Sequence, residues 1–299
     1  MEKNCGGITG EKNMNLPSVT IKELLEAGVH LGHKTFRWNP KMSKFIFGSK
    51  NSIHIIDLVQ TLEMANAALV QVHNCISSGG NILFVSTKKQ AAEAIAKLAA
   101  DTSQFYVNHR WLGGMLTNWN TIPNSIKRLK KLTIDLKKEN TGFTKKENLK
   151  MGIHRDKLER SLGGIAEMKK IPNMIFIVDT NVEELAVKES IRLNIPIIAI
   201  VDTNSDPTGI NFPIPGNDDA RRAINLYCDL IKETILDAQN NMKIAKEESQ
   251  INDNEIKEIK KETKEDIEVK KDKTKESKVG KISKSILSKV KSLASKKIN

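Results

Sequence analysis

Three uninterrupted apolar runs constrain the fold of this chain most strongly. They are NILFVST (81–87), NMIFIVDTN (173–181) and IPIIAIVDTN (195–204). Strands that are buried on both faces of a sheet have this continuous pattern, whereas half-buried strands alternate apolar and polar residues. Helix-length segments follow the runs along the chain. The pattern therefore predicts an α/β fold with a parallel sheet covered by helices on both faces.

The segments around these strands supply the predicted helices. Thr20 and Glu23 form a capping box before IKELLEAG, and Gly28 is a plausible stop. Further helices are expected at 58–78, 88–101, 182–194 and 217–239, and two short strands at 44–48 and 52–58. The α/β domain is therefore expected to comprise residues 18–120 and 166–244.

Residues 121–165 interrupt the alternation of strands and helices. Apolar residues at helical spacing predict two helices that form an antiparallel hairpin, with ENTGF (139–143) as the turn. LGG triplets flank this segment at 112–114 and 162–164. Glycines there would let the hairpin pack closely on the sheet domain, although two chance triplets are the simpler alternative.

Both ends of the chain read differently from the middle. Residues 1–17 are expected to be a disordered extension, and Met14 is a candidate second start of translation. Residues 245–299 are rich in Lys and Glu and contain no aromatic residue, so a disordered tail is expected there.

The charge distribution points to a polyanionic partner. The formal net charge is +12, and residues 123–160 carry 12 Lys plus Arg against 5 acids. Residues 241–299 carry 17 Lys against 11 acids, so the rest of the chain is nearly neutral. No apolar run approaches the roughly 20 residues of a membrane span. Three scattered cysteines form no metal or disulfide spacing, which favours a reducing cytosol.

The repeated VDTN motif is the most enzyme-like feature. Asp179, Asp202 and Asp206 follow two predicted parallel strands, where ligands bind in open α/β sheets, and Asp218 and Asp219 could join them there, so a metal or phosphate site is one hypothesis. Helix capping by Thr180, Asn181 and Asn217 is the simpler explanation. No glycine-rich phosphate loop or catalytic triad spacing stands out. We therefore predict no catalytic residues, no bound metal and no cofactor.

Two tryptophan-containing stretches favour an RNA surface. HKTFRWNPKM (33–42) and HRWLGGMLTNW (109–119) combine cations and amides with the chain's three tryptophans. Cations contact phosphates, and indole or guanidinium planes stack on unpaired bases. Alternatively, the tryptophans anchor the hairpin while the charges stay solvated. The candidate RNA-binding residues are Lys34, Arg37, Asn39, Lys41, Arg110, Asn118, Lys127, Arg128, Lys130 and Lys131.

Long motifs in this order resemble the S-two family of bacterial small-subunit ribosomal proteins. They include EAGVHLGHKTFRWNPKMSKFIFGSKNSIHIIDL, VNHRWLGGMLTNW and IVDTNSDPTGINFPIPGNDDA, and the resemblance covers about residues 18–240. It implies a flavodoxin-like domain with a helical hairpin arm. It also implies a structural role in the small ribosomal subunit, without catalysis.

The resemblance extends to partners and location. It implies binding to small-subunit rRNA and docking of the S-one family ribosomal protein, beside neighbouring small-subunit proteins. The expected location is the cytoplasm, on the small subunit and not in a membrane, and no homo-oligomer is expected. A flavodoxin-like enzyme using Asp179, Asp202 and Asp206 remains the alternative.

Overall fold

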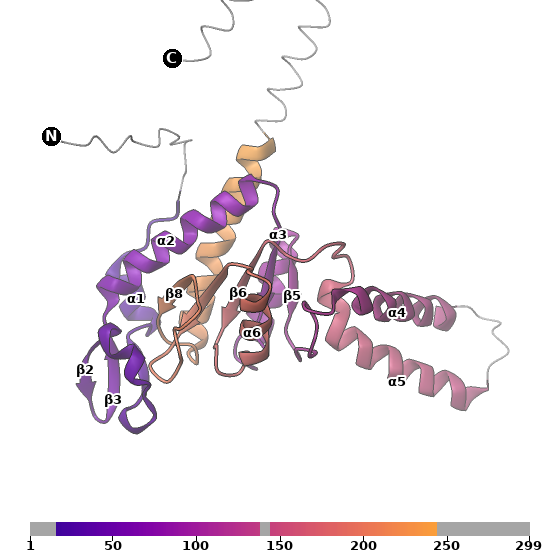
Figure 1. Cartoon of the computed structure of the whole chain (residues 1–299), viewed down its shortest axis with the longest axis horizontal. Coiled ribbons are helices and arrows are strands. Elements are labelled where there is room, and N and C mark those ends of the chain that lie inside the picture. The colour runs from indigo at the N-terminus through magenta and orange to yellow at the C-terminus, as the bar shows by residue number, and fades with distance from the viewer. Residues whose placement is uncertain (1–15, 138–143, 244–299) are drawn as a thin grey trace, which may run out of the picture. The chain divides into compact units, whose positions relative to one another are not determined.

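A five-stranded parallel sheet forms the centre of the molecule in the computed structural model, which describes residues 16–137 and 144–243 (Figure 1). The strands are β4 (Ile82–Val85), β5 (Phe105–Val107), β6 (Met174–Val178), β7 (Ile197–Val201) and β8 (Phe212–Pro215). They lie in the order β5-β4-β6-β7-β8. Numbered along the chain this is 2-1-3-4-5, the order of the flavodoxin-like fold. The predicted fold class is confirmed.

The continuous apolar runs have a direct structural cause. Met174, Phe176 and Val178 of β6 pack into one apolar cluster, and the intervening Ile175 and Ile177 pack into a second cluster on the opposite face. Successive side chains of a strand point to opposite faces, so a strand covered on both sides needs apolar residues at every position.

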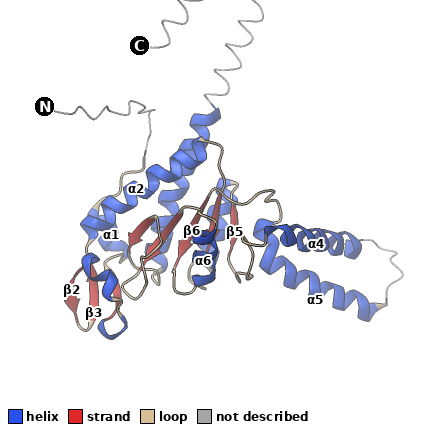
Figure 2. Cartoon of the chain, in the orientation of Figure 1, coloured by secondary structure: helices blue, strands red, loops and turns tan. Residues whose placement is uncertain are grey.

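Different elements cover the two faces of the sheet (Figure 2). One face packs against α1 (Ile21–Ala27), α2 (Leu58–Ser77), α3 (Ala92–Thr102) and a helix over residues 221–243. The other packs against α6 (Glu184–Arg192) and against loop and 3-10 segments that include Trp111, Met115 and Leu116. The tryptophan-containing stretch 109–119 therefore helps to cover this second face of the sheet.

A three-stranded antiparallel sheet precedes the α/β core. It contains β1 (Leu31–Lys34), β2 (Ile46–Lys50) and β3 (Ile53–Ile56) in the order β1-β3-β2, with 3-10 turns η1 (Thr35–Arg37) and η2 (Pro40–Phe45) between β1 and β2. The sequence predicted β2 and β3 but not β1, β5 or β8. These three strands are short, and β8 contains two prolines, which only an edge strand tolerates well.

The predicted hairpin consists of α4 (Ile122–Lys137) and α5 (Lys145–Leu162), which run side by side in Figure 1. We call α4 and α5 the arm. Short 3-10 turns, η3 (Trp119–Thr121) and η4 (Gly163–Ile165), join it to the core. A Cβ atom on Gly164 would overlap the carbonyl oxygen of Tyr106 in β5, so the second LGG triplet does permit close packing. In the first triplet, a Cβ on Gly113 would meet nothing within 4 Å.

Some predicted caps are confirmed and others are wrong. Thr20 forms its capping box, and Gly28 ends α1 at φ 78°. Thr180 and Asn181 do not cap α6, because the carboxylate of Asp179 accepts hydrogen bonds from the backbone N–H groups of residues 181 and 182 instead. The turn at 139–143, Met14, the first 15 residues of the expected N-terminal extension and the expected tail at 245–299 lie outside the described residues.

Candidate nucleic-acid interface

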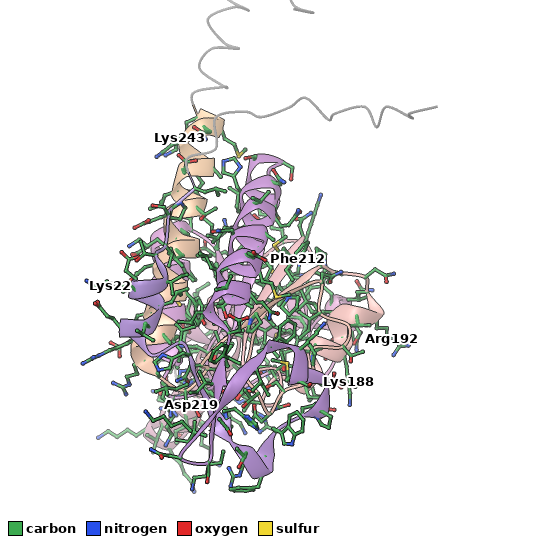
Figure 3. The ribbon with its side chains drawn as sticks, turned by 90° about the vertical axis from the view of Figure 1, so that its left-hand side faces the viewer. Lys22, Lys188, Arg192, Phe212, Asp219 and Lys243 are labelled. Carbon is green, nitrogen blue, oxygen red and sulfur yellow. The ribbon has the colours of Figure 1, made fainter. Side chains whose placement is uncertain are left out.

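The segment 108–121, here called the arm-base loop, joins β5 to the arm. Trp111 is buried within it, and its indole Nε1–H donates a hydrogen bond to Oε1 of Glu189 at 3.1 Å. Glu189 lies on α6, whose Lys188 and Arg192 point outward (Figure 3). A single carboxylate on the inner side of α6 therefore holds this indole.

The same carboxylate organises the backbone of the loop. It accepts hydrogen bonds from the N–H groups of Gly114 at 2.8 Å, Leu116 at 2.9 Å and Thr117 at 3.0 Å, and from the Thr117 hydroxyl at 3.2 Å. Burial alone would raise the pKa of Glu189. The hydrogen bonds outweigh burial and lower this pKa, which keeps the carboxylate ionised.

The other two tryptophans occupy different environments. Trp119 is half-buried against the same apolar cluster as Trp111. Trp38 is 41% exposed, and its ring centroid lies 5.5 Å from that of His54. The two indoles at the base of the arm therefore serve packing, while the third remains accessible to a partner.

The predicted arm residues lie on an exposed surface. Lys127, Arg128, Lys130 and Lys131 of α4, here called the arm cations, are all exposed. Ile126 and Leu129 are buried on the same helix. The helical period thus separates a packed side of α4 from a cationic side. Arg110 and Asn118 are exposed in the arm-base loop.

The N-terminal candidates form two groups. Lys34 and Arg37 are exposed, and the Arg37 guanidinium lies 5.4 Å from the centre of the exposed Phe36 ring. Asn39 and Lys41 are engaged within the protein: Asn39 caps η2 by accepting the Lys41 N–H at 3.0 Å. The Lys41 ammonium is also 2.7 Å from Asp206. Two of the ten candidates are therefore already engaged within the protein.

Several of the acids in the VDTN hypothesis do gather at the carboxyl end of the parallel strands, but they surround a lysine that was not predicted. Lys88, after β4, lies 2.8 Å from each of Asp179, Asp218 and Asp219. The facing acids raise the pKa of Lys88 although burial opposes the shift. β4 and β6 flank the point where the strand order reverses, which is the usual ligand crevice of such folds. Here the Lys88–Asp179 ion pair lies at that point.

Negative charge is in excess within this cluster. Burial, together with Asp179 and Asp202, raises the pKa of Asp218 to about 7, and Lys88 only partly offsets this. His33 lies 2.7 Å from Asp202 and 3.4 Å from Asp219. Its hydrogen bond to Asp202 raises its pKa, although burial opposes the shift. The excess of acids accounts for both shifts, because nearby negative charge favours the protonated form of Lys88 and of Asp218 alike.

The three acids of the enzyme hypothesis have separate partners. Asp179 pairs with Lys88, Asp202 with His33, and Asp206 with Lys41. The Lys41 hydrogen bond lowers the pKa of Asp206 to about 2. A different set has a geometry suited to a cation: side-chain atoms of His33, Asp218 and Asp219 lie within 4.8 Å of one another. The sequence pointed to Asp218 and Asp219 as possible ligands but not to His33 beside them, because His33 lies far away along the chain.

Comparison with known proteins identifies the family. The family described as Ribosomal protein S2 matches residues 24–238. The chain belongs to the ribosomal protein S2 family. It is 55% identical over 224 residues to the small ribosomal subunit protein uS2 of Parvibaculum lavamentivorans, covering 75% of this chain and 88% of that protein. The uS2 proteins of Sinorhizobium medicae and Bartonella henselae are 56% and 57% identical over the same length, covering 75% of this chain and 88% and 87% of their own.

Membership of the S2 family confirms the resemblance seen in the motifs. The chain is a structural constituent of the small ribosomal subunit and acts in translation. Among the described residues, no helix has the length and apolar composition required to cross a membrane.

Proposed function

We propose that this S2 family protein binds small-subunit rRNA, with the arm as its main electrostatic contact. The observation that carries the proposal is the exposed row of arm cations on a hairpin whose base is fixed by Glu189. Lysine and arginine side chains bind phosphates with little sequence dependence. A rigid base lets these cations meet the RNA in one orientation, which reduces the entropy lost on binding.

A second surface favours protein docking. Phe47 of β2 and Phe36 of η1 are 80% and 73% exposed, and Trp38, which follows η1, is 41% exposed. Exposed aromatic residues of this kind are enriched in protein interfaces. We assign docking of the S-one family ribosomal protein to this surface, and neighbouring small-subunit proteins to the remaining body.

The ion pairs at the carboxyl end of the sheet support a non-catalytic role. Each of the three acids that the enzyme hypothesis needs is already paired with a side chain of the same chain. We therefore assign the protein a structural function on the small subunit in the cytoplasm, as a single copy and without a catalytic cofactor.

The test measures binding to small subunits from which this protein has been removed by high salt. Replacing all four arm cations by Ala should weaken binding and reduce the salt dependence of log K by roughly 0.7 to 0.9 per lost phosphate contact. The matched control replaces the exposed residues Lys22, Lys188, Arg192 and Lys243, which changes the net charge equally (Figure 3).

Equal losses in the two variants would show that only net charge matters and would remove the arm as the binding site. An unchanged salt dependence in the arm variant would place the RNA surface elsewhere.

A further inference from the structure

A groove lies at the base of the arm, between the arm-base loop and the C-terminal half of α5. Its larger hollow has a volume of about 590 Å³ and is lined by residues that include His109, Arg110 and Arg160. A second hollow of about 270 Å³ shares His109 and Arg160 with the first. The larger volume is within the range of roughly 300–1,000 Å³ that is typical of small-ligand sites.

The larger hollow is cationic. Arg110, Lys157 and Arg160 are exposed along it, and none of them forms an ion pair with an acid within the part of the chain that the structure describes. Its acid, Asp156, is bound by the guanidinium of Arg155 at 2.9 Å. Guanidinium groups bind phosphates with two parallel hydrogen bonds, so an anionic ligand fits this charge.

One wall of the same hollow is apolar. Ile153 of α5 is 61% exposed there, and Leu112 of the arm-base loop is half-buried. The imidazole of His109 adds a flat surface. Ile153 belongs to neither apolar cluster, so its side chain is not part of the packed core. A ligand that combines a phosphate with a flat face matches both walls.

We propose that this groove binds one unpaired nucleotide of the small-subunit rRNA. The phosphate would lie between Arg110 and Arg160, and the base would stack on His109 and Ile153. Unpaired bases are bound by proteins in this way, with stacking and phosphate contacts combined. An acidic protein segment would match the guanidinium groups but would leave the flat wall unused. The inference rests on the proposed rRNA binding and assigns it a specific contact.

The experiment uses the full chain and small subunits that lack this protein. Arg160→Ala should reduce the salt dependence of log K by roughly 0.7 to 0.9. His109→Ala should weaken binding by about 5-fold or more without changing the salt dependence, because stacking does not release counterions. Ile153→Ala should weaken binding less. Ile134→Ala is the matched control, because Ile134 is 57% exposed on α4 and outside the groove.

Ultraviolet crosslinking identifies what fills the groove. The peptide containing His109 should crosslink to an unpaired rRNA nucleotide, and His109→Ala should remove that crosslink. If the groove variants bind as tightly as the Ile134→Ala control while the arm cations still govern salt dependence, the nucleotide site is overturned and rRNA binding stands. If neither set of variants changes binding, both proposals fail. A crosslink from this peptide to a neighbouring protein would overturn the nucleotide site alone.

Discussion

Glu189 and Trp111 are 78 residues apart in sequence, yet their side chains form a buried hydrogen bond of 3.1 Å. The same carboxylate binds three backbone N–H groups of the arm-base loop. Removing this acceptor therefore leaves two buried donors, the Trp111 indole and the Leu116 N–H, and further part-buried donors unpaired. A contact between α6 and the arm-base loop thus holds the segment from which the arm leaves the core.

Glu189→Ala should lower the free energy of unfolding by at least about 3 kcal/mol, because each unpaired buried donor costs roughly 1–3 kcal/mol. Glu189→Gln should lower the free energy of unfolding less, because the amide oxygen still accepts hydrogen bonds. Some loss should remain, because the amide NH2 group then faces the other donors of the loop. Urea unfolding followed by tryptophan fluorescence measures both. Glu184→Gln is the control, because Glu184 is exposed on the same helix and pairs with Lys188. Equal stability of the Glu189 and Glu184 variants would contradict this role.

The twin LGG triplets provide a matched pair of substitutions. Gly164→Ala should destabilise the protein by about 1–3 kcal/mol or more, because the added methyl group overlaps the rigid backbone of Tyr106. Gly113→Ala should be nearly neutral, since its Cβ would point into open space. The thermal transition midpoint of each variant measures the difference. Similar midpoints would show that the second triplet is not a packing contact.

The raised pKa of Asp218 predicts a pH dependence of stability. The pKa of Asp218 is about 7 in the folded state, whereas in the unfolded state the carboxyl ionises near its ordinary pKa of 3.8. The folded state therefore binds more protons across this window, and the contribution of Asp218 to stability falls as pH rises from about 4 to 7.

Asp218→Asn should remove this fall, because the amide does not ionise. As pH rises from 4.5 to 7.5, the unfolding free energy of the variant should therefore rise relative to that of the wild type. Urea titrations across this range measure it. Asp156→Asn, on the exposed side of the arm, should follow the wild-type curve. A constant difference between Asp218→Asn and wild type would rule out the shifted pKa.

Deletion of residues 245–299 should leave the thermal transition within a few degrees of that of the full chain. Among the described residues, the buried members of the apolar cluster that contains α2 end at Ala238, and Met242 packs against this cluster, so the deletion keeps every described core residue. Differential scanning calorimetry of the two proteins makes the comparison. A large loss of stability would show that the C-terminal segment packs on the body.

The sequence by itself determined the elements whose signals are local. The runs at 82–85, 174–178 and 197–201 are apolar at every position because both faces of the sheet are covered, and this pattern is legible without coordinates. The capping box at Thr20 and the cationic side of α4 are equally local, since they depend on spacings of three and four residues. The family motifs were legible for the same reason.

Only the tertiary structure decided which distant polar side chains meet. Lys88, Asp179 and Asp218 come from three separate loops, and parallel strands bring those loops together at one edge of the sheet. The sequence suggested caps for Thr180 and Asn181, but Asp179 takes the local N–H groups, and its other oxygen pairs with Lys88. No motif in the sequence singles out Glu189. Its partners lie more than 70 residues away, and side-chain contacts over such separations depend on topology that no local periodicity encodes.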